Sequence, residues 1–400
     1  AGHPWIFRDA LADSPSLAEG TTVLVRGRDR RPIGRGFWDA TAPIAVRVLT
    51  TTAGQSLRDL VYQRIAEALA ERRTRLAGTD TTAFRWIHGE ADRLPGVHVD
   101  VYDTVAAVRF DGGGARAFYR ALAAQLLEVD TTVRAVIDRQ SRALLAGDPG
   151  ALAACTEVRE NGLRFAVDLA HGQKGGLFLD QRENRAEIRR RAAGKRVLNL
   201  FGYTGGFSVY AAAGGASATC TVDVAAPAIA AAADNFARNG LDRTHARFCA
   251  EDAFAFLTAA RDRGELWDIV ISDPPSFAPN QRALPAARAA YRRLHALAAA
   301  VTAPDGLFCP ASCSSHFPWP EFRASVEDGV RAAGRRFVSQ HEAGAGFDHP
   351  VRAWFPEGDY LKFAIGAVPV GPDSRGRPRS NPGGPGRVHL PNRSRPSPRR

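Results

Sequence analysis

From about residue 160 onward, short apolar segments of strand length alternate with longer segments whose apolar residues recur at helical spacing. Three of the strand-like segments end at distinctive positions: the glycine-rich turn 201–207, Asp223 and Asp273. Strands that alternate with helices predict a parallel, doubly wound sheet with helices on both faces. Such a sheet binds its ligands beyond the carboxyl ends of the strands. We therefore expect these residues to form one cleft in an α/β domain that spans residues 173–370.

The sequence before this domain predicts two smaller units. Residues 21–49 contain three short runs of strand-forming residues separated by polar turns, which indicate a small antiparallel barrel within residues 1–55. Residues 57–76 place apolar side chains at helical spacing and begin an α+β module that spans residues 56–172. In this module we expect strands near 84–88, 97–102, 105–110 and 133–138, a helix near 115–128, and a loop from about 140 to 157.

The charge and the cysteine content of the chain limit the kinds of binding partner and the cellular location that we expect. The chain carries a formal net charge of +11, and residues 371–400 contribute eight arginines against one acid, Asp373. This segment is too polar to bury a core, so we expect a disordered basic tail that either attracts nucleic acid weakly or is simply solvated. The five cysteines have no regular spacing, which argues against disulfides and a zinc site. No apolar stretch is long enough to span a membrane, and a cytoplasmic location fits best.

The glycine-rich turn predicts a nucleoside-bearing cofactor. It reads Phe201-Gly202-Tyr203-Thr204-Gly205-Gly206-Phe207, which is not the dinucleotide-binding pattern. S-adenosylmethionine (SAM) has no phosphate and requires only a tight, open turn beside its methionine part. Asp223 follows Gly205 by eighteen residues, at the end of the next strand, where a carboxylate can accept both ribose hydroxyls. Taken alone, each feature also fits an ordinary strand–helix turn or a solvated aspartate. The candidates for cofactor binding here are Phe201, Gly202, Thr204, Gly205 and Asp223.

Two further polar segments are candidates for the same cofactor. Asp252 follows the third strand, where it can accept a hydrogen bond from the adenine amine, although a helix N-cap before Ala253 is an almost equally good interpretation. Asp180 and Arg182 lie in a polar cluster after an apolar run. A helix N-terminus rich in donors can hold the methionine carboxylate of SAM or an RNA phosphate. A capped helix with exposed charges is the alternative.

Cys313 and Asp273 predict chemistry at a carbon atom. Cys313 follows a fifth strand and lies forty residues after Asp273, which begins the run Asp-Pro-Pro-Ser. Cytosine C5 is a poor nucleophile, but a thiolate that adds to C6 makes C5 enamine-like, so that C5 can take a methyl group from the sulfonium. Asp273 can hydrogen-bond N3 or the exocyclic amine of the ring. The other cysteines in predicted strands are interpreted as buried, inert thiols: Cys220, Cys249 and Cys309.

A resemblance to a known family rests on seven short segments, at residues 3–7, 89–96, 178–185, 201–207, 273–277, 312–314 and 349–362. Together they resemble the PUA-domain-containing class I SAM-dependent methyltransferases of bacteria that make 5-methylcytosine in 23S rRNA. The resemblance implies a PUA-like β-barrel, a central α+β module and a Rossmann-like catalytic domain.

Three departures from the family pattern stand out, one of which is a short loop between the central module and the catalytic domain, and Ser276 is a separate fourth. Members usually carry a basic stretch before the His-Pro-Trp run, which is absent here, so we expect a barrel shortened at its N-terminus. Gly175 stands where the family tends to have Thr, and Gly202 where it often has Cys or Ser. Ser276 stands where many RNA cytosine-C5 methyltransferases have a second cysteine, so product release has no assigned group.

The favoured function is methyl transfer from SAM to C5 of a cytosine in structured RNA, with 23S rRNA as the expected substrate. Two alternatives stay open. One is a methyltransferase that acts on a base nitrogen through the Asp-Pro-Pro carbonyls, with Cys313 as a bystander. The other is a non-catalytic RNA-binding protein with a vestigial cofactor site. The oligomeric state also stays open, with a homodimer as one form.

Overall fold

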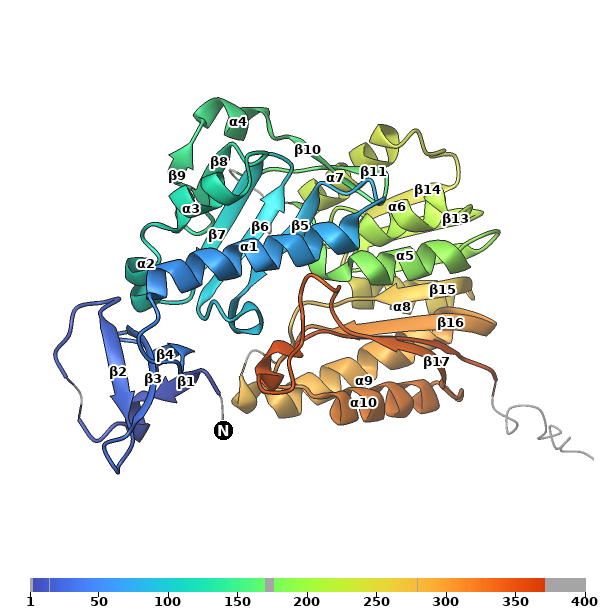
Figure 1. Ribbon diagram of the computed structural model, residues 1–400. Helices are drawn as coiled ribbons and strands as arrows, with labels where there is room; N and C mark the ends of the chain where they lie inside the picture. Colours follow the sequence, from blue (N-terminus) through green and yellow to red (C-terminus); the bar gives the residue numbers. More distant parts are fainter. Residues whose placement is uncertain (1–2, 14, 170–175, 279, 371–400) are drawn as a thin grey trace, which may run out of the picture.

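The computed structural model describes residues 3–13, 15–169, 176–278 and 280–370. Figure 1 shows three units that follow one another along the chain: a small β-domain, a central module around helix α1, and a larger α/β domain. The expected tail and Gly175 lie outside the described residues. Within these ranges, no helix is long and apolar enough to cross a membrane, and no cluster of histidine, cysteine and carboxylate side chains could hold a metal ion.

The N-terminal domain is a four-stranded antiparallel sheet. Trp38 and Val46 are paired in register on adjacent strands and form a small core of their own. Phe37 belongs instead to the core of the central module, because neighbouring residues of a strand point to opposite faces. The three strands expected at 21–49 are confirmed, and a fourth precedes them. The strands are β1 (Trp5–Phe7), β2 (Thr22–Arg26), β3 (Pro32–Trp38) and β4 (Ile44–Thr50), in the order β1-β4-β3-β2.

The central module packs one long helix on a five-stranded sheet. Helix α1 (Leu57–Leu76) is capped by Ser56, whose hydroxyl accepts a hydrogen bond from the backbone N–H of Asp59. The apolar face of α1, including Ile65 and Leu69, lies in the core beneath the sheet. This helix and the first four strands confirm the expected pattern. The strands, in spatial order, are β5 (Ala83–His88), β6 (Val97–Tyr102), β7 (Val105–Phe110), β8 (Ala135–Asp138) and β9 (Leu144–Gly147).

The single helix expected near 115–128 is wrong. The chain forms two helices there, α2 (Gly113–Phe118) and α3 (Leu122–Val129). It leaves helical geometry at Tyr119, whose buried ring meets the ring of Phe37 edge-on. Packing against the N-terminal domain therefore interrupts a helix that the apolar spacing alone would have continued.

The loop expected at 140–157 is also wrong. It contains strand β9 and helix α4 (Pro149–Ala154). Asp148 caps α4 by accepting a hydrogen bond from the backbone N–H of Gly150. Strand β9 is an edge strand with exposed leucines that pairs with β8, so the signal of a buried apolar strand is absent from its sequence.

The third unit is built on a seven-stranded mixed sheet in the order β14-β13-β12-β15-β16-β18-β17. The five strands β12 to β16 are parallel, as expected. Strand β18 is antiparallel to both β16 and β17, so the sheet is not wholly parallel as predicted. The strands are β12 (Arg196–Leu200), β13 (Ala218–Asp223), β14 (Ala246–Ala250), β15 (Trp267–Ser272), β16 (Thr302–Ser312), β17 (Val338–Ala343) and β18 (Lys362–Ala367).

Helices cover both faces of this sheet. On one face, Phe256, Leu294 and Val326 from three helices share a core with β13 and β15. On the other face, Ile188 and Phe207 pack against β12 and β15. A hairpin of β10 (Glu157–Glu160) and β11 (Leu163–Ala166) joins this unit to the central module. The helices are α5 (Arg182–Arg191), α6 (Gly206–Ala213), α7 (Ala226–Arg238), α8 (Ala253–Asp262), α9 (Leu284–Val301) and α10 (Trp319–Ala332).

Candidate active site

A cavity of about 840 Å³ opens at the carboxyl ends of strands β12, β13 and β15. The structure brings eight of the ten candidate residues to its wall. Two candidates are not on this wall, Gly205 and Arg182. The eight lining residues are Phe201, Gly202, Thr204, Asp223, Asp252, Asp180, Asp273 and Cys313.

The turn after β12 is tight and needs its glycines. A Cβ atom at Gly202 would lie 2.6 Å from Cγ2 of Thr221, and one at Gly205 would lie 2.8 Å from Cβ of Ala232. Gly205 also has a backbone φ of 79°, a value that residues with a Cβ atom rarely adopt. The hydroxyl of Thr204 donates a 2.7 Å hydrogen bond to the carbonyl of Gly176 and ties the turn to the segment before α5. Gly205 therefore shapes this wall without lining it.

Asp223 is oriented by backbone hydrogen bonds. Its Oδ2 accepts from the N–H of Tyr203 at 2.9 Å, and its Oδ1 accepts from the N–H of Ala225 at 2.9 Å. The carboxylate is half-buried at the end of β13. Each carboxylate oxygen has a second lone pair, so a held acceptor is available for ligand hydroxyls.

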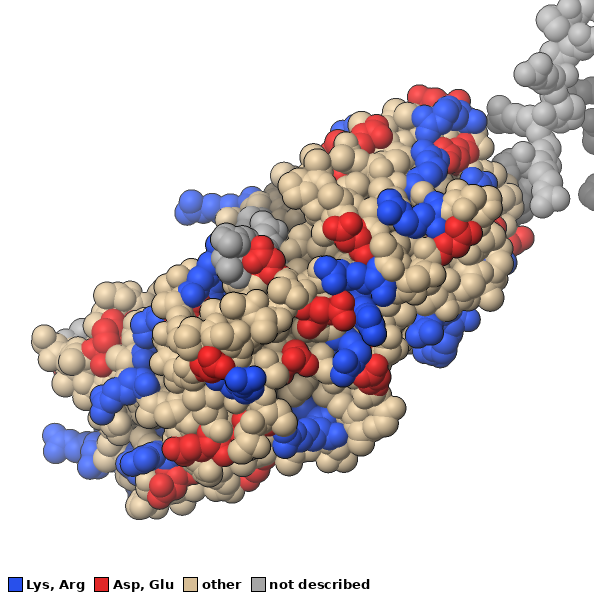
Figure 2. Space-filling model, turned by 90° about the horizontal axis from the view of Figure 1, so that it is seen from above, with Lys and Arg blue, Asp and Glu red and all other residues tan. Residues whose placement is uncertain are grey.

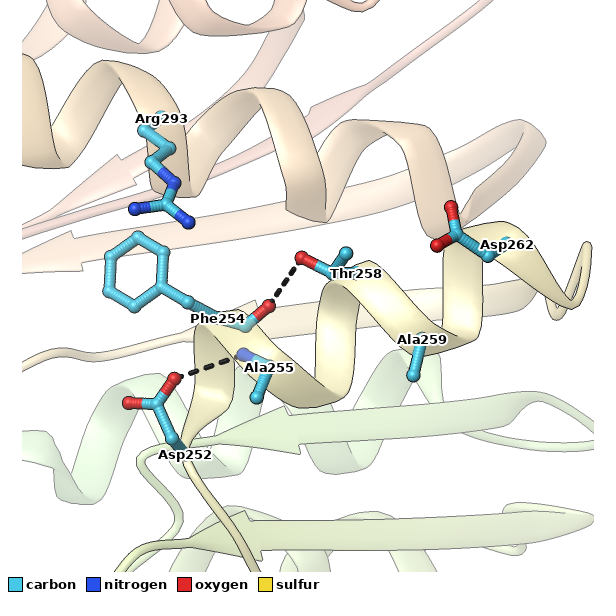
Figure 3. A pocket seen from close by; sticks show the side chains of 7 residues that line it. All are labelled: Asp252, Phe254, Ala255, Thr258, Ala259, Asp262 and Arg293. Carbon is cyan, nitrogen blue, oxygen red and sulfur yellow. Dashed lines mark hydrogen bonds between the residues drawn. The ribbon is translucent and has the colours of Figure 1, made fainter.

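Asp252 both caps a helix and lines the cavity, so the structure is compatible with both of the roles considered for it from the sequence. Its Oδ1 accepts a 2.9 Å hydrogen bond from the N–H of Ala255 and caps α8, as Figure 3 shows. The same residue lines the large cavity. Figure 3 also shows a shallow groove on the outer side of α8, where the guanidinium of Arg293 lies 5.1 Å from the ring centre of Phe254. Asp252 thus lies at the boundary between this groove and the cavity.

The polar cluster before α5 divides between two roles. Asp180 is buried at the cavity, and its Oδ2 accepts a 2.6 Å hydrogen bond from the hydroxyl of Tyr360. Arg182 is buried elsewhere, where it pairs with Asp348 at 3.0 Å. Arg185, one helical turn further on, lines the cavity in its place. The i, i+3 spacing on α5 is the signal that could have indicated Arg185.

Asp273 and Cys313 follow neighbouring parallel strands. Asp273 is the residue after β15, and its Oδ2 accepts a 2.8 Å hydrogen bond from Nε2 of Gln181. Cys313 is the residue after β16 and is half-buried. The hydroxyls of Ser276 and Ser314 lie 2.9 Å apart. The run after β15 therefore meets the residue that follows Cys313.

Comparison with known proteins identifies the family. Residues 133–348 match the family described as S-adenosylmethionine-dependent methyltransferase, and residues 1–51 match a PUA-like domain. The chain is 35% identical over 379 residues to Ribosomal RNA large subunit methyltransferase I of Shewanella amazonensis, which covers 92% of this chain and 95% of that protein. This chain belongs to the SAM-dependent methyltransferases.

Further comparisons place this methyltransferase among relatives of similar length. It is 33% identical over 377 residues to the protein of the same name from Escherichia coli, covering 90% of this chain and 94% of that one. The crystal structure of SMU.776 complexed with SAH matches it with a TM-score of 0.81 and 25% identity, over 92% of this chain and 96% of that one. A protein from Streptococcus mutans shares the fold, with a TM-score of 0.80 and 24% identity. The expected PUA-like and Rossmann-like domains and the SAM cofactor are confirmed.

The cavity of this methyltransferase fits SAM on its own geometry. The glycines keep the turn after β12 open, and Asp223 presents an oriented carboxylate. The rings of Phe178 and Tyr203, which line the cavity, meet edge-on at 5.3 Å and offer apolar surface. Apolar and aromatic surface together with a few fixed polar groups suits a nucleoside.

Lys362 is a buried cation beside Cys313 that the sequence analysis did not single out. Its Nζ donates to the carbonyl oxygens of Ser314 at 2.7 Å and Tyr360 at 2.8 Å. Burial lowers the pKa of Lys362 to about 8, although Asp359 and Cys313 act to raise it. The chain has only two other lysines, at 174 and 195. A rare lysine within an apolar strand was the available signal.

The remaining cysteines of this methyltransferase lie away from the cavity. Cys309 is fully buried in β16, and burial raises the pKa of its thiol. Burial also raises the pKa of Cys155 to about 11. Cys249 is half-buried, and its Sγ lies 3.9 Å from that of Cys220 on the adjacent strand.

Proposed function

We propose that the protein transfers a methyl group from SAM to C5 of a cytosine in RNA, with 23S rRNA as the substrate. The observation that carries this proposal is that Cys313 and Asp273 line the same cavity as the glycine turn and Asp223. A thiol and a carboxylate thus flank the place where a planar base can meet the cofactor. The names of the curated relatives, Ribosomal RNA large subunit methyltransferase I, support rRNA as the substrate class.

The proposed chemistry needs a thiolate at Cys313. Bound SAM supplies an electrophilic methyl group on a sulfonium. The Cys313 thiolate forms a bond to C6, which makes C5 nucleophilic. After the methyl group is on C5, the C5 proton leaves as a proton and the C6–S bond breaks, so that the thiolate is restored. Asp273, held by Gln181, stabilises the ring by a hydrogen bond at N3 or the exocyclic amine.

The proposed cofactor residues have distinct tasks. Asp223 accepts the ribose hydroxyls, and Asp252 accepts from the adenine amine while it caps α8. Phe201, Gly202 and Thr204 form the wall beside the methionine part, with Gly205 shaping the turn. Asp180 lies at the methionine end, where Arg182 acts only through the ion pair that fixes its helix. We also propose the domain limits 1–55, 56–172 and 173–370, followed by the tail.

One face of the protein presents a mixture of basic and acidic side chains to RNA. On the face in Figure 2, basic and acidic side chains are interspersed and no uniformly basic stripe crosses the view. Sequence-independent attraction to phosphates is therefore divided among scattered arginines and the arginine-rich segment 371–400. Recognition of the target then depends on contacts to bases, which are accessible when RNA is unpaired.

A covalent trap tests the proposal. RNA that carries 5-fluorocytosine at the methylated position has no C5 proton to lose, so the adduct with Cys313 should accumulate in the presence of SAM. We expect a denaturation-resistant protein–RNA complex for the wild type and none for Cys313→Ala. Nucleoside mass spectrometry of methylated rRNA should find 5-methylcytosine. A nitrogen-methylated base without a covalent complex would favour the Asp-Pro-Pro alternative and contradict the proposal.

A further inference from the structure

A second cavity of about 380 Å³ lies between the central module and the α/β domain. Strands β5, β6 and β7 form one wall, and the segment from His349 to Tyr360 forms the other. This cavity shares Leu177, Phe178 and Asp180 with the cofactor cavity. It also reaches Ser315, two residues after Cys313. The two cavities are therefore neighbours with a common wall.

Two buried histidines present unused nitrogen atoms to this second cavity. His88 is 7% exposed, and its Nδ1 lies 2.8 Å from a guanidinium nitrogen of Arg85. Arginine can only donate, so this Nδ1 accepts and the proton of the ring is on Nε2. Burial, and after it the neighbouring His349 and Arg85, lower the pKa of His88 well below its usual value, which keeps the ring neutral. Among the described residues, the Nε2–H of His88 has no hydrogen-bond partner.

His349 has the complementary arrangement. It is 2% exposed, and its Nδ1 lies 3.0 Å from a carboxylate oxygen of Asp348. A carboxylate accepts, so Nδ1 carries a proton and Nε2 is the ring nitrogen left for a ligand. No described residue bonds to this Nε2. The centres of the two imidazole rings lie 5.1 Å apart, so these two nitrogens belong to neighbouring rings. Both histidines line the second cavity, where a ligand can hydrogen-bond to these nitrogens.

The charges around the second cavity select against a phosphate. Its carboxylates outnumber its guanidinium groups, five to three. The central charges are already paired, since Asp100 accepts from both Arg85 and Arg139. An incoming phosphate would meet net negative charge. The five carboxylates are Glu90, Asp100, Asp111, Asp180 and Glu357, and the three guanidinium groups belong to Arg85, Arg109 and Arg139.

Aromatic rings supply the rest of the lining. The rings of Trp5 and Phe355 meet edge-on at 5.0 Å at the wall of the cavity. The indole Nε1 of Trp5 donates a 2.6 Å hydrogen bond to Glu90 and so fixes the ring against the central module. A planar, uncharged ligand with hydrogen-bonding groups on its edge matches aromatic walls beside two imidazole rings.

We propose that the second cavity binds the nucleobase of an RNA nucleotide adjacent to the target cytosine. Nε2 of His88 donates to this base, Nε2 of His349 hydrogen-bonds to its edge, and Trp5 and Phe355 contact its ring. This inference rests on the proposed function, because the target base is taken to lie at Cys313. It assigns sequence recognition to residues of the central module, the N-terminal domain and the segment before β18, which converge only in the folded protein.

The test measures binding of short RNAs to the SAH-bound enzyme. The probe is a fluorescent 23S rRNA fragment that contains the mapped 5-methylcytosine site, with each flanking nucleotide replaced in turn by an abasic one. For the wild type, we expect one flanking abasic position to raise Kd about tenfold, as the loss of paired hydrogen bonds implies. His88→Phe and His349→Phe should raise Kd for the intact fragment by a similar factor. Each of these two variants should bind the intact fragment and the fragment with the sensitive abasic position with the same Kd.

Two further variants separate recognition from structural damage. His88→Gln keeps an N–H near the position of Nε2 and should restore part of the affinity. His341→Phe, on strand β17 outside the cavity, should bind every fragment as the wild type does. Unchanged SAH affinity in all variants controls for folding.

The outcomes are distinct. If the abasic replacement and the histidine substitution raise Kd independently, so that their effects on binding free energy add, the inference is overturned. It is also overturned if the histidine variants depend on the flanking base as the wild type does. In both cases the proposed methylation of cytosine can still hold. A reduced salt dependence in the histidine variants would indicate a phosphate contact and would overturn it too. If no 5-methylcytosine is formed, the proposed function fails and the inference fails with it.

Discussion

Nζ of Lys362 lies 2.7 Å from the carbonyl oxygen of Ser314, the residue that follows Cys313. This hydrogen bond ties strand β18 to the loop after β16, where the nucleophile is proposed to act. Lys362 is only 1% exposed, and its Nζ donates to two backbone carbonyl oxygens. A buried ammonium group thus both positions the loop and places positive charge near a thiol.

Replacing Lys362 with Met should make Cys313 less reactive at neutral pH. The positive charge favours the thiolate, and Lys362 carries that charge below its pKa of about 8. At pH 7 we expect alkylation of Cys313 by iodoacetamide to slow about tenfold in the variant. The difference should shrink as the pH rises above 8, because wild-type Lys362 then loses its proton. Lys195→Met, at an exposed position, is the control. Equal rates at pH 7 would exclude this electrostatic role.

The two cysteines at the end of β16 should behave differently. Cys313→Ala should abolish methylation and leave SAM affinity close to that of the wild type, because the thiol is proposed to touch the base and not the cofactor. Cys309→Ala should retain methylation and lose only some packing, since Cys309 is fully buried and lines no part of the cavity. Methyl transfer from labelled SAM to rRNA measures both. Comparable rates for Cys313→Ala and the wild type would refute the covalent mechanism.

Removing the carboxylate of Asp223 should weaken SAM binding. Loss of a charged acceptor for ligand hydroxyls costs about 1–3 kcal/mol, and Asp223 also holds the N–H of Tyr203 in the glycine turn. Calorimetry of Asp223→Ala should therefore show a raised Kd with the fold intact. Asp234→Ala, on the exposed face of α7, is the matched control. An unchanged Kd for Asp223→Ala would remove this residue from the proposed site.

The ion pair between Glu160 and Arg185 should matter for stability. Arg185 donates to both carboxylate oxygens of Glu160, at 2.9 and 2.8 Å, and both side chains are almost fully buried. Glu160→Gln leaves the guanidinium without its counter-charge, which costs about 3–5 kcal/mol in buried pairs. Glu157→Gln breaks a partly exposed pair with Arg238 and should cost less than about 1 kcal/mol. Urea unfolding compares the two. Equal midpoints would contradict the prediction.

Deleting residues 371–400 should leave SAM affinity unchanged. The segment carries eight arginines and one acid. Without these charges, fewer counterions are released from the RNA when the protein binds, so the electrostatic part of the binding free energy is smaller. We expect weaker RNA binding at low salt and a flatter dependence of log Kd on log salt. Titrations at two salt concentrations measure the slope. Identical slopes with and without the segment would show that it takes no part in binding.

Much of the catalytic half could be predicted from the sequence, because its information is local. Apolar strands followed by glycine or acid at the carboxyl end predicted that Gly202, Asp223, Asp273 and Cys313 would lie on one cavity, and they do. Parallel strands carry their following residues to the same edge of the sheet, so no long-range information was needed. The periodicity of α1 likewise predicted its limits without reference to its partners.

Only the tertiary structure decided which charged residues reach the cavities. The segment after β17 runs to the central module, where the backbone N–H of Arg85 bonds to Asp348, and it returns antiparallel as β18. This path buries Arg182 against Asp348. It also brings Lys362 beside Cys313 and places the ring of His349 against that of His88. Each of these pairs joins residues far apart in the chain. Local patterns predict the elements, but the free energy of burying a charge depends on a partner that only the completed fold supplies.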